Sequence, residues 1–230
     1  MYINNFQRVE EKYVIKKEDK KKLLKVINSY IKEDEYFKSE IHNIYFDTQN
    51  NDLIINSLEK PIFKDKFRIR SYGIPNYNDY VFLEMKTKYK GVVGKRRIKI
   101  RLNELDDYLE KNKETDNEIL KEIIYYYKYY KLKKAIYIAY DRESYKGILD
   151  NNLRITFDSN LRSRRNDVYF KEDNMIKYFD EDYYIMEIKT IGALPLWLAR
   201  SLSELKIYPT SFSKYGKIYE HEMKEMVKNA

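Results

Sequence analysis

Three segments of the chain place a Glu two residues before a Lys within a pattern typical of a β-strand. They are Glu10-Glu11-Lys12, Glu84-Met85-Lys86 and Glu187-Ile188-Lys189. Alternate side chains of a strand project from the same face, so each Glu shares a face with its Lys. Such a carboxylate can pair with a neighbouring base, or it can hold a divalent cation that bridges phosphate oxygens. The spacing alone leaves both roles open.

Basic side chains on other predicted strands extend this charged face. Phe67-Arg68-Ile69-Arg70 presents two arginines on one face, and the segment 153–158 presents an Arg, a Thr and an Asp, while the opposite faces are apolar. Gathering positive charge costs stability through self-repulsion, so strands that converge with these faces inward would predict a bound polyanion. Arg forks and Lys ammonium groups both suit phosphate oxygens. The basic residues concerned are Lys12, Arg68, Arg70, Lys86, Lys95, Arg142, Arg154, Lys189 and Lys214.

A solvated outer face is the competing interpretation of the same residues. For any single strand it is favoured, because 36% of the residues are charged and the Glu-x-Lys spacing recurs in helical settings at 18–20, 204–206 and 222–224. Only the combination of charged faces from elements along the whole chain favours a binding surface.

The elements that would position these residues follow from periodicity. Alternation predicts strands at 6–15, 40–48, 66–72, 80–87, 95–102, 135–144, 153–158 and 183–190. Helical spacing predicts helices at 17–31, 105–112, 119–131 and 214–227, with a further helix behind Pro195. Gly73-Ile74-Pro75-Asn76 predicts a turn that pairs two of the strands. We therefore expect one α+β domain over residues 1–230, whose antiparallel sheet is large enough to curl or close.

Composition favours an anionic partner and excludes several chemistries. Lys and Arg number 45 against 37 Asp and Glu, a formal charge of +8 that suits nucleic acid, a nucleotide, a phosphate polymer or a membrane surface. The absence of cysteine excludes disulfides and thiolate chemistry. We find no signal peptide and no apolar run near the roughly 20 residues of a membrane span, and expect a soluble cytoplasmic protein.

Other motifs favour structural roles. The segment 91–95 is too short for a P-loop, and neither His42 nor His221 has metal-ligand spacing around it, so we expect both histidines to be structural. The tyrosines of 125–130 could stack nucleic-acid bases, but a tyrosine-rich helix packing on a sheet is favoured. No nucleic-acid partner is expected.

At these residues the sequence resembles the polyphosphate polymerase domain of the vacuolar transporter chaperone (VTC) family, within the triphosphate tunnel (CYTH-like) superfamily. The resemblance covers nearly the whole chain. The motifs that carry it lie at 10–13, 67–73, 83–86, 140–142, 154–158, 186–189 and 211–216. It implies an antiparallel eight-stranded β-barrel that forms a basic tunnel, with helices packed outside. The implied activity is transfer of the γ-phosphate of ATP to a growing polyphosphate chain, with Mn²⁺ or Mg²⁺ as cofactor.

The resemblance also implies roles for individual residues. Glu187 matches the metal ligand, and Lys189 is added because it shares the predicted face of Glu187. The residues expected in catalysis are Lys12, Arg68, Arg70, Lys86, Arg142 and Glu187. Those expected to bind phosphate are Lys12, Arg68, Arg70, Lys86, Lys95, Tyr140, Arg142, Arg154, Lys189, Ser213 and Lys214.

Two departures from related sequences bear on the expected activity. Ser211 stands where the family has a lysine, which could weaken chain binding or alter the balance of synthesis and hydrolysis. Hydrolytic relatives carry Glu-x-Glu-x-Lys in the first strand, and Arg8 replaces the first Glu here, which favours a polymerase over a triphosphate hydrolase. A non-catalytic polyphosphate-binding domain is the other alternative. The expected partners are ATP and polyphosphate, with a membrane partner protein if elongation is coupled to translocation.

Overall fold

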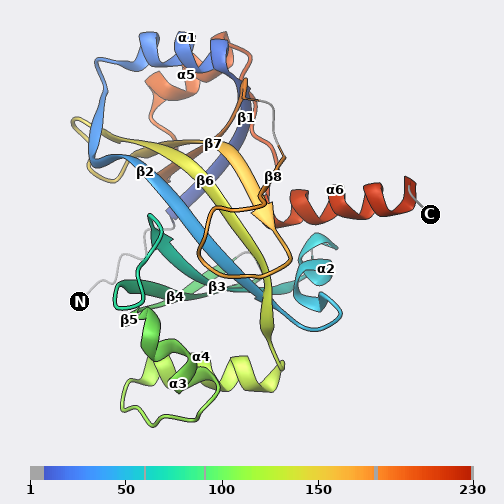
Figure 1. Ribbon diagram of the computed structural model, residues 1–230. Coiled ribbons are helices and arrows are strands. Elements are labelled where there is room, and N and C mark those ends of the chain that lie inside the picture. Colours follow the sequence, from blue (N-terminus) through green and yellow to red (C-terminus); the bar gives the residue numbers. More distant parts are fainter. Residues whose placement is uncertain (1–7, 60, 91, 179–180, 229–230) are drawn as a thin grey trace. The chain divides into compact units, whose positions relative to one another are not determined.

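A computed structural model describes residues 8–59, 61–90, 92–178 and 181–228 (Figure 1). The strands are β1 (Arg8–Lys16), β2 (Ile31–Asp47), β3 (Phe63–Tyr72), β4 (Tyr80–Tyr89), β5 (Val92–Arg101), β6 (Lys133–Gly147), β7 (Arg154–Arg164), β8 (Ile176–Lys177) and β9 (Tyr183–Ile191). The helices are α1 (Lys17–Ile27), α2 (Asp52–Leu58), α3 (Leu105–Leu109), α4 (Glu118–Tyr129), α5 (Leu196–Glu204) and α6 (Lys214–Lys228), with a 3₁₀ turn at Leu102–Glu104. The predicted α+β class is confirmed.

The strands form an antiparallel sheet in the hydrogen-bonded order β1-β9-β7-β6-β2-β3-β4-β5, with β8 added to β7. Closure into a barrel would require hydrogen bonds between β1 and β5. No such pairing occurs among the residues that the structure describes, so this sheet is not closed, in contrast to the predicted barrel.

The chain divides into two compact units. Unit 1 comprises residues 1–39, 140–161 and 178–213, and unit 2 comprises residues 40–139, 162–177 and 214–230. Strands β2, β6 and β7 contribute residues to both. The prediction of a single domain over the whole chain stays a prediction.

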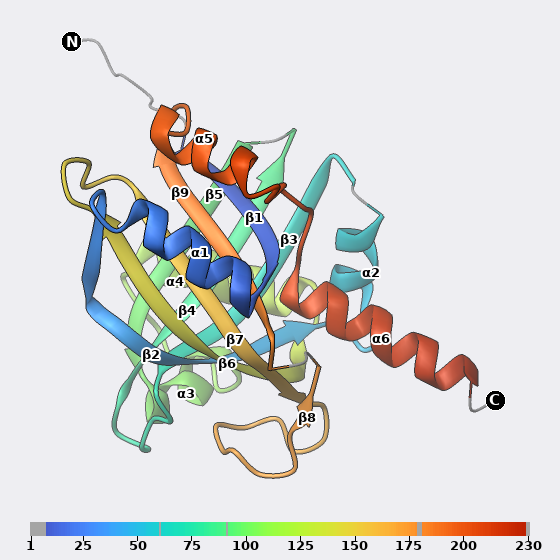
Figure 2. The same cartoon turned by 90° about the horizontal axis from the view of Figure 1, so that it is seen from above.

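In unit 1 the apolar faces of the sheet lie under two helices. Helices α1 and α5 lie side by side over β1 and β9 (Figure 2). The core that they cover contains Tyr13, Leu23, Phe157, Met186 and Leu198, each at most 1% exposed. Because strand side chains alternate, burying Tyr13 and Met186 turns Lys12 and Glu187 to the opposite face.

In unit 2 the apolar face of β3, β4 and β5 packs against α4. Phe67, Leu83 and Ile123 are fully buried there. The predicted β3–β4 pairing is confirmed, with the turn at Gly73 in the left-handed region at φ 77°. The tyrosine-rich helix also packs on the sheet, as expected, through Tyr127. Burial of this face leaves the alternate residues, including Arg68 and Glu84, on the other side.

Several boundaries differ from those predicted. Helix α1 ends at Ile27, not at 31, and β2 begins at Ile31 rather than at 40. The sequence did not predict the first half of β2, because that half is largely exposed and lacks the alternation of a half-buried strand. Phe6, the predicted start of β1, lies outside the described residues. Helix α2 was not predicted, since its first turn is stabilised by the upstream Asp47, whose carboxylate accepts from the Leu53 amide at 2.8 Å. No helix in the described part of the chain is long and apolar enough to cross a membrane.

Candidate functional site

The polar face of β3, β4 and β5 in unit 2 is strongly basic. The strand registers place Lys66, Lys86 and Lys95 in one row across the three strands. The next rows are Arg68, Glu84 and Arg97, and then Arg70, Phe82 and Lys99. We call these nine positions the basic face. Like charges directly opposite one another on neighbouring strands are destabilising, so the lysine row indicates a face built for an anion.

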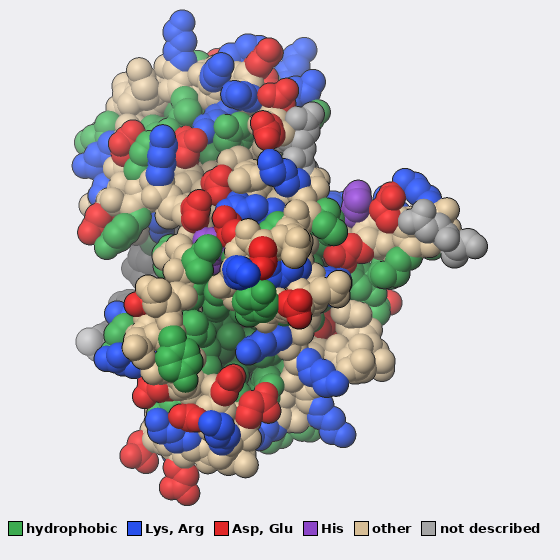
Figure 3. Space-filling view, viewed as in Figure 1, with side chains coloured by type: hydrophobic (Ala, Val, Ile, Leu, Met, Phe, Trp, Pro, Cys, Tyr) green, Lys and Arg blue, Asp and Glu red, His purple; other side chains and the backbone are tan. Residues whose placement is uncertain are grey.

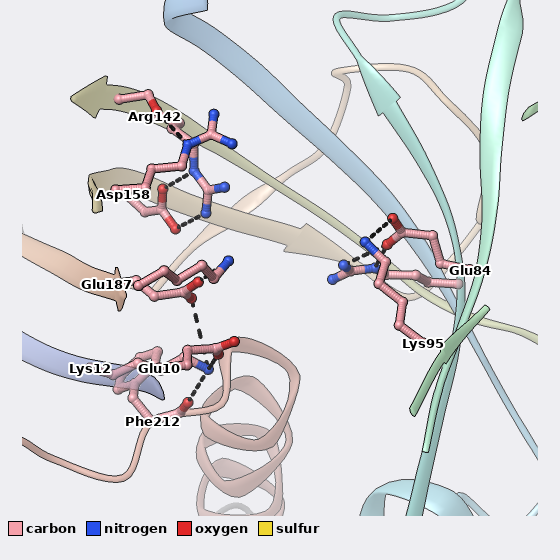
Figure 4. Close-up of polar contacts among 12 residues, drawn as sticks. Glu10, Lys12, Glu84, Lys95, Arg142, Asp158, Glu187 and Phe212 are labelled. Atoms are coloured by element: carbon pink, nitrogen blue, oxygen red, sulfur yellow. Dashed lines mark hydrogen bonds and ion pairs between the residues drawn. The ribbon is translucent and has the colours of Figure 1, made fainter. Parts of the chain in front are cut away.

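Glu84 is the one acidic residue of the basic face, and it is held by three cations. Its side chain is 3% exposed. Arg68 contacts one carboxylate oxygen at 2.6 Å through Nη2 and 2.8 Å through Nε. Lys95 lies 3.1 Å from the other oxygen (Figure 4). Arg97 lies 3.2 Å from that same oxygen. Burial would raise the pKa of Glu84, but Arg68, Arg70 and Lys95 outweigh it and lower the pKa to about 2.

The two arginines of β3 are also fixed by neutral partners. Arg68 donates to the Tyr45 hydroxyl at 3.0 Å, and Arg70 donates through Nε to the side-chain oxygen of Asn43 at 2.9 Å. Burial would raise the pKa of Tyr45, yet Arg68, Arg70 and Lys66 together lower it to about 8. The pKa of Tyr45 is lowered because the positive charges on this face stabilise the ionised form of its hydroxyl.

The polar face of β1, β9 and β7 in unit 1 is charged but balanced. Its rows are Glu10, Lys189 and Arg154, then Lys12, Glu187 and Thr156. A third row places Asp158 beside Ile185 and Val14. We call these nine positions the balanced face. Acidic residues lie opposite or beside basic ones along it, as ordinary cross-strand pairs do.

Glu187 lies between two lysines on the balanced face. The Lys12 ammonium is 3.9 Å from Glu187, 3.1 Å from Glu10 and 3.4 Å from the Phe212 carbonyl oxygen (Figure 4). Lys189 forms an ion pair with the other oxygen of Glu187. The Glu187 side chain is 11% exposed, whereas Lys12, Lys189 and Glu10 are 29–30% exposed. The carboxylate is thus held in place by side chains that solutes can reach.

Arg142 and Arg154 in unit 1 are both engaged by acids. Arg142 and Asp158 form a bidentate pair, with nitrogen–oxygen distances of 2.6 and 2.7 Å (Figure 4). Burial alone would lower the pKa of Arg142, but Asp158 outweighs it and raises the pKa. Arg154 contacts Asp34 at 3.1 Å and the Ser144 hydroxyl at 3.0 Å. The Arg142 fork is therefore rigid and permanently charged, which suits a group that positions phosphate.

The remaining predicted residues divide between the two units. Unit 1 contains Lys12, Tyr140, Arg142, Arg154, Glu187, Lys189 and Ser213, and unit 2 contains Arg68, Arg70, Lys86, Lys95 and Lys214. Tyr140 is 2% exposed, with its ring 5.4 Å from the Arg142 guanidinium carbon. Ser213 and Lys214 are half-buried, and Lys214 is the first residue of α6. Their assignment to phosphate binding stays a prediction.

Three residues of the basic face are not among the site residues predicted from the sequence. Lys66, Arg97 and Lys99 belong to the basic face but were not selected as site residues. Arg97 and Lys99 could have been found, because they alternate with the apolar Ile98 and Ile100. On the face of the molecule shown in Figure 3, Lys and Arg side chains are interspersed with Asp and Glu.

His42 has neighbours that the sequence did not predict. It is fully buried, as a structural histidine would be, and burial lowers its pKa. Glu40 and Glu172 lie beside it, however, in a group that could hold a metal ion. Spacing along the chain could not reveal this group, because Glu172 is 130 residues from His42 in sequence.

The chain belongs to the VTC domain family, which matches it over residues 7–222. The family predicted from the sequence is therefore confirmed. No match was found among curated proteins.

Solved structures share the fold at low sequence identity. A candidate adenylyl cyclase from Hippeastrum, reported to have a dominant triphosphatase activity, is 15% identical with a TM-score of 0.56, covering 94% of this chain and 96% of its own. A candidate adenylate cyclase from Bacillus halodurans is 16% identical with a TM-score of 0.52, covering 90% and 93%. One from Vibrio parahaemolyticus is 12% identical with a TM-score of 0.51, covering 92% and 97%. These likenesses show that the chain shares its fold with these three proteins.

Proposed function

We propose that this protein is a metal-dependent polyphosphate polymerase, which transfers the γ-phosphate of ATP to a growing polyphosphate chain. The observation that carries the proposal is the basic face of β3, β4 and β5. This face has seven Lys and Arg side chains and a single carboxylate, Glu84. Glu84 forms ion pairs with three of those side chains. The excess of basic over acidic residues on this face makes a long polyanion a better ligand than a small neutral molecule. Membership of the VTC domain family supports the same substrate class.

The arrangement suits phosphoryl transfer, in which positioning and charge neutralisation supply most of the catalysis. Arg68 and Arg70 would grip phosphate oxygens with forks that Tyr45 and Asn43 already orient. Lys86 and Lys95 would add point charges along the chain. In unit 1, Lys12, Arg142, Arg154 and Lys189 would bind phosphate, with Tyr140 and Ser213 as further contacts. In unit 2, Lys214 would be a further contact.

A divalent cation fits the oxygen donors around Glu187. The ammonium of Lys12 lies between the carboxylates of Glu10 and Glu187, at a place where positive charge is already favoured. Mg²⁺ and Mn²⁺ accept oxygen ligands and are held by one or two carboxylates, while substrate phosphates complete the coordination. Glu187 would hold the ion, and the ion when bound would neutralise charge on the phosphate oxygens.

The direct test is incubation of the purified protein with ATP and Mn²⁺, with the products resolved on a gel. We expect a ladder of polyphosphate that a polyphosphate-specific phosphatase removes. A matched pair of variants isolates the site: Lys86→Ala should reduce product, whereas Lys224→Ala, which removes the same charge from an exposed position on α6, should not. If correctly folded protein formed no polymer from ATP and Mn²⁺, the proposal would be contradicted.

Hydrolysis of triphosphate or short polyphosphate is the second candidate. The specific observation in its favour is the dominant triphosphatase activity reported for the structurally similar Hippeastrum protein. The same incubation separates the two reactions, because a hydrolase releases orthophosphate and forms no polymer. A protein that binds polyphosphate and turns over neither substrate would instead be a non-catalytic binding domain.

A further inference from the structure

A second group of metal-ligating side chains lies in unit 2, apart from the residues used above. Glu40 and His42 are two residues apart on β2 and share one face of that strand. Glu172 comes from the segment 165–175, the loop before β8 in Figure 1. One ligand atom from each of the three residues lies within 4.8 Å of the others.

The buried nitrogen of His42 lacks a partner that a metal ion would supply. The ring is 0% exposed, and its Nδ1 lies 2.6 Å from the Tyr137 hydroxyl. Nε2 has no hydrogen-bond partner among the described residues and points toward Glu40, whose carboxylate oxygen is 3.5 Å away. A buried polar atom left without a partner is destabilising. When Nδ1 donates its proton to the Tyr137 oxygen, the lone pair of Nε2 faces the carboxylates, an arrangement that a cation would stabilise.

Glu172 is held in place although its segment has no regular secondary structure. Arg162 donates to the Glu172 carboxylate at 2.7 Å. The side chain of Arg164 is 6% exposed and fixes the backbone on both sides of Glu172. It donates to the carbonyl oxygens of Asp167 at 2.9 Å, Tyr169 at 3.0 Å, Lys171 at 3.0 Å and Asp173 at 2.7 Å. A ligand positioned in this way loses little conformational freedom on binding a metal.

We propose that Glu40, His42 and Glu172 bind a Zn²⁺ ion, which ties the segment 165–175 to β2. One imidazole and two carboxylates form a nitrogen and oxygen ligand set that Zn²⁺ accepts, with water in the fourth position. Ligands at about 2.1 Å from a tetrahedral ion lie about 3.4 Å apart. The His42–Glu40 separation of 3.5 Å is close to this spacing. The Glu40 side chain is 54% exposed, which gives the ion a path from solvent. This site does not depend on the proposed polymerase activity.

The two histidines of the chain allow a direct test. The full chain, labelled with ¹⁵N only at histidine, would be titrated with Zn²⁺ and followed by NMR. We expect the Nε2 resonance of His42 to move to a metal-bound value, while Nδ1 remains protonated. His221 serves as the internal reference and should not change. An imidazolium signal for His42 that Zn²⁺ leaves unchanged would overturn the proposal in favour of a simple pair with Glu40.

Variants of the carboxylates show whether these three residues form the site. Glu40→Gln and Glu172→Gln keep the shape of each side chain and leave buried His42 in place. Each should weaken Zn²⁺ binding, measured by calorimetry, by at least the roughly 10–100-fold that loss of a supporting residue around a metal costs. Glu114→Gln, at an exposed position of unit 2, is the matched control and should bind as the wild type. If Glu187→Gln abolishes the binding instead, the ion belongs to the Glu187 region and the proposal fails.

Discussion

The two charged faces of the molecule begin from the same sequence motif and differ in what their neighbouring strands add. On the balanced face of unit 1, three basic residues, Lys12, Arg154 and Lys189, accompany three acidic ones, Glu10, Asp158 and Glu187. On the basic face of unit 2, seven basic residues accompany Glu84 alone. A Glu-x-Lys motif therefore takes its chemistry from the strands beside it. Glu84 is enclosed by cations, whereas Glu187 keeps a second acid close to it.

This difference leads us to assign opposite roles to the two glutamates. Both carboxylate oxygens of Glu84 already form ion pairs with cations of the basic face. We therefore assign Glu84 a structural role, in which its negative charge reduces the repulsion among these cations. Glu187 and Glu10 share the Lys12 ammonium, and we propose that a divalent cation is held in the same region. We therefore assign phosphate binding to the basic face and metal binding to the balanced face.

Removing the Glu84 carboxylate should produce the largest effect. Glu84→Gln leaves Arg68, Lys95 and Arg97 without their buried counter-charge, and breaking a buried pair in this way costs about 3–5 kcal/mol in the free energy of unfolding. Because Lys95 and Arg97 are partly exposed, we expect the lower end of that range. Chemical denaturation measures it.

The control for this variant is Glu122→Gln, which breaks the exposed pair of Glu122 with Arg96 and should cost less than about 1 kcal/mol. Tripolyphosphate should stabilise Glu84→Gln more than it stabilises the wild type, since the added anion replaces the lost one. Equal stabilisation would show that the cations around Glu84 do not bind phosphate.

Acid should reveal the same carboxylate in the wild-type protein. The pKa of Glu84 is lowered to about 2 in the folded state from 4.5, so its contribution is complete above about pH 4.5 and is lost as the pH falls toward 2. The difference in unfolding free energy between the wild type and Glu84→Gln should therefore shrink across this window. A difference that stays constant down to pH 2 would contradict the assigned ion pairs.

Replacing the Glu187 carboxylate should slow turnover strongly and leave polyphosphate binding intact. Glu187→Gln removes the proposed metal ligand and should reduce kcat by about 10²–10³-fold, the scale of losing one group that stabilises the transition state. Polyphosphate affinity should be unchanged or slightly higher, because one negative charge is lost. Rates of polymer formation and a binding titration measure the two effects.

The variant Glu204→Gln, at the exposed end of α5, is the control and should retain activity. If Glu187→Gln turned over ATP normally, the balanced face would carry no metal. If Glu187→Gln instead weakened polyphosphate binding strongly, the division of roles between the two faces would be wrong.

The difference between the two faces could be predicted only in part from the sequence. Alternation correctly turned Lys12, Arg68 and Glu187 away from the apolar core, and Gly73 correctly marked the β3–β4 turn. The spacing treats Glu84 and Glu187 alike, however, because both precede a Lys by two residues. What separates them is the register with the neighbouring strands, which depends on tertiary pairing that no single segment encodes.

Helix α2 and the Glu40, His42 and Glu172 group escaped prediction for the same physical reason. Helix α2 depends on a buried carboxylate of Asp47 that precedes it. The metal-ligating group depends on a loop that Arg164 folds through four carbonyl contacts. These interactions depend on how the chain folds and not on the hydrophobic pattern of the segment itself, so periodicity cannot predict them.

Neutralising one lysine of the basic face should have a smaller effect. It should relieve repulsion in the free protein and weaken the binding of polyphosphate. Lys86→Ala removes a charge that lies directly opposite Lys66 and Lys95. Relief of the repulsion from Lys66 and Lys95 should contribute about 0.2–1 kcal/mol to the stability of the free protein. Polyphosphate binding should weaken, and the slope of its logarithm against that of salt concentration should fall by about 1, as for loss of one phosphate contact.

Arg154→Ala makes the comparison with the balanced face. Its guanidinium is paired with Asp34, so its loss should destabilise the free protein rather than stabilise it. If both variants changed stability in the same direction, the contrast in charge balance between the faces would have no energetic consequence.

The smallest effect concerns Tyr45, a probe for charge on the basic face. Its folded-state pKa of about 8 lies below its ordinary value of 10.0, so the folded protein releases this proton first. The resulting stabilisation is complete above about pH 10 and is lost as the pH falls through about 8. An ultraviolet titration of the wild type minus that of Tyr45→Phe should show one tyrosine ionising near pH 8. Polyphosphate should shift this ionisation upward, because phosphate beside Arg68 cancels the charge that lowers the pKa. A midpoint that polyphosphate leaves unchanged would place the polymer away from Arg68 and remove the basic face from the proposed site.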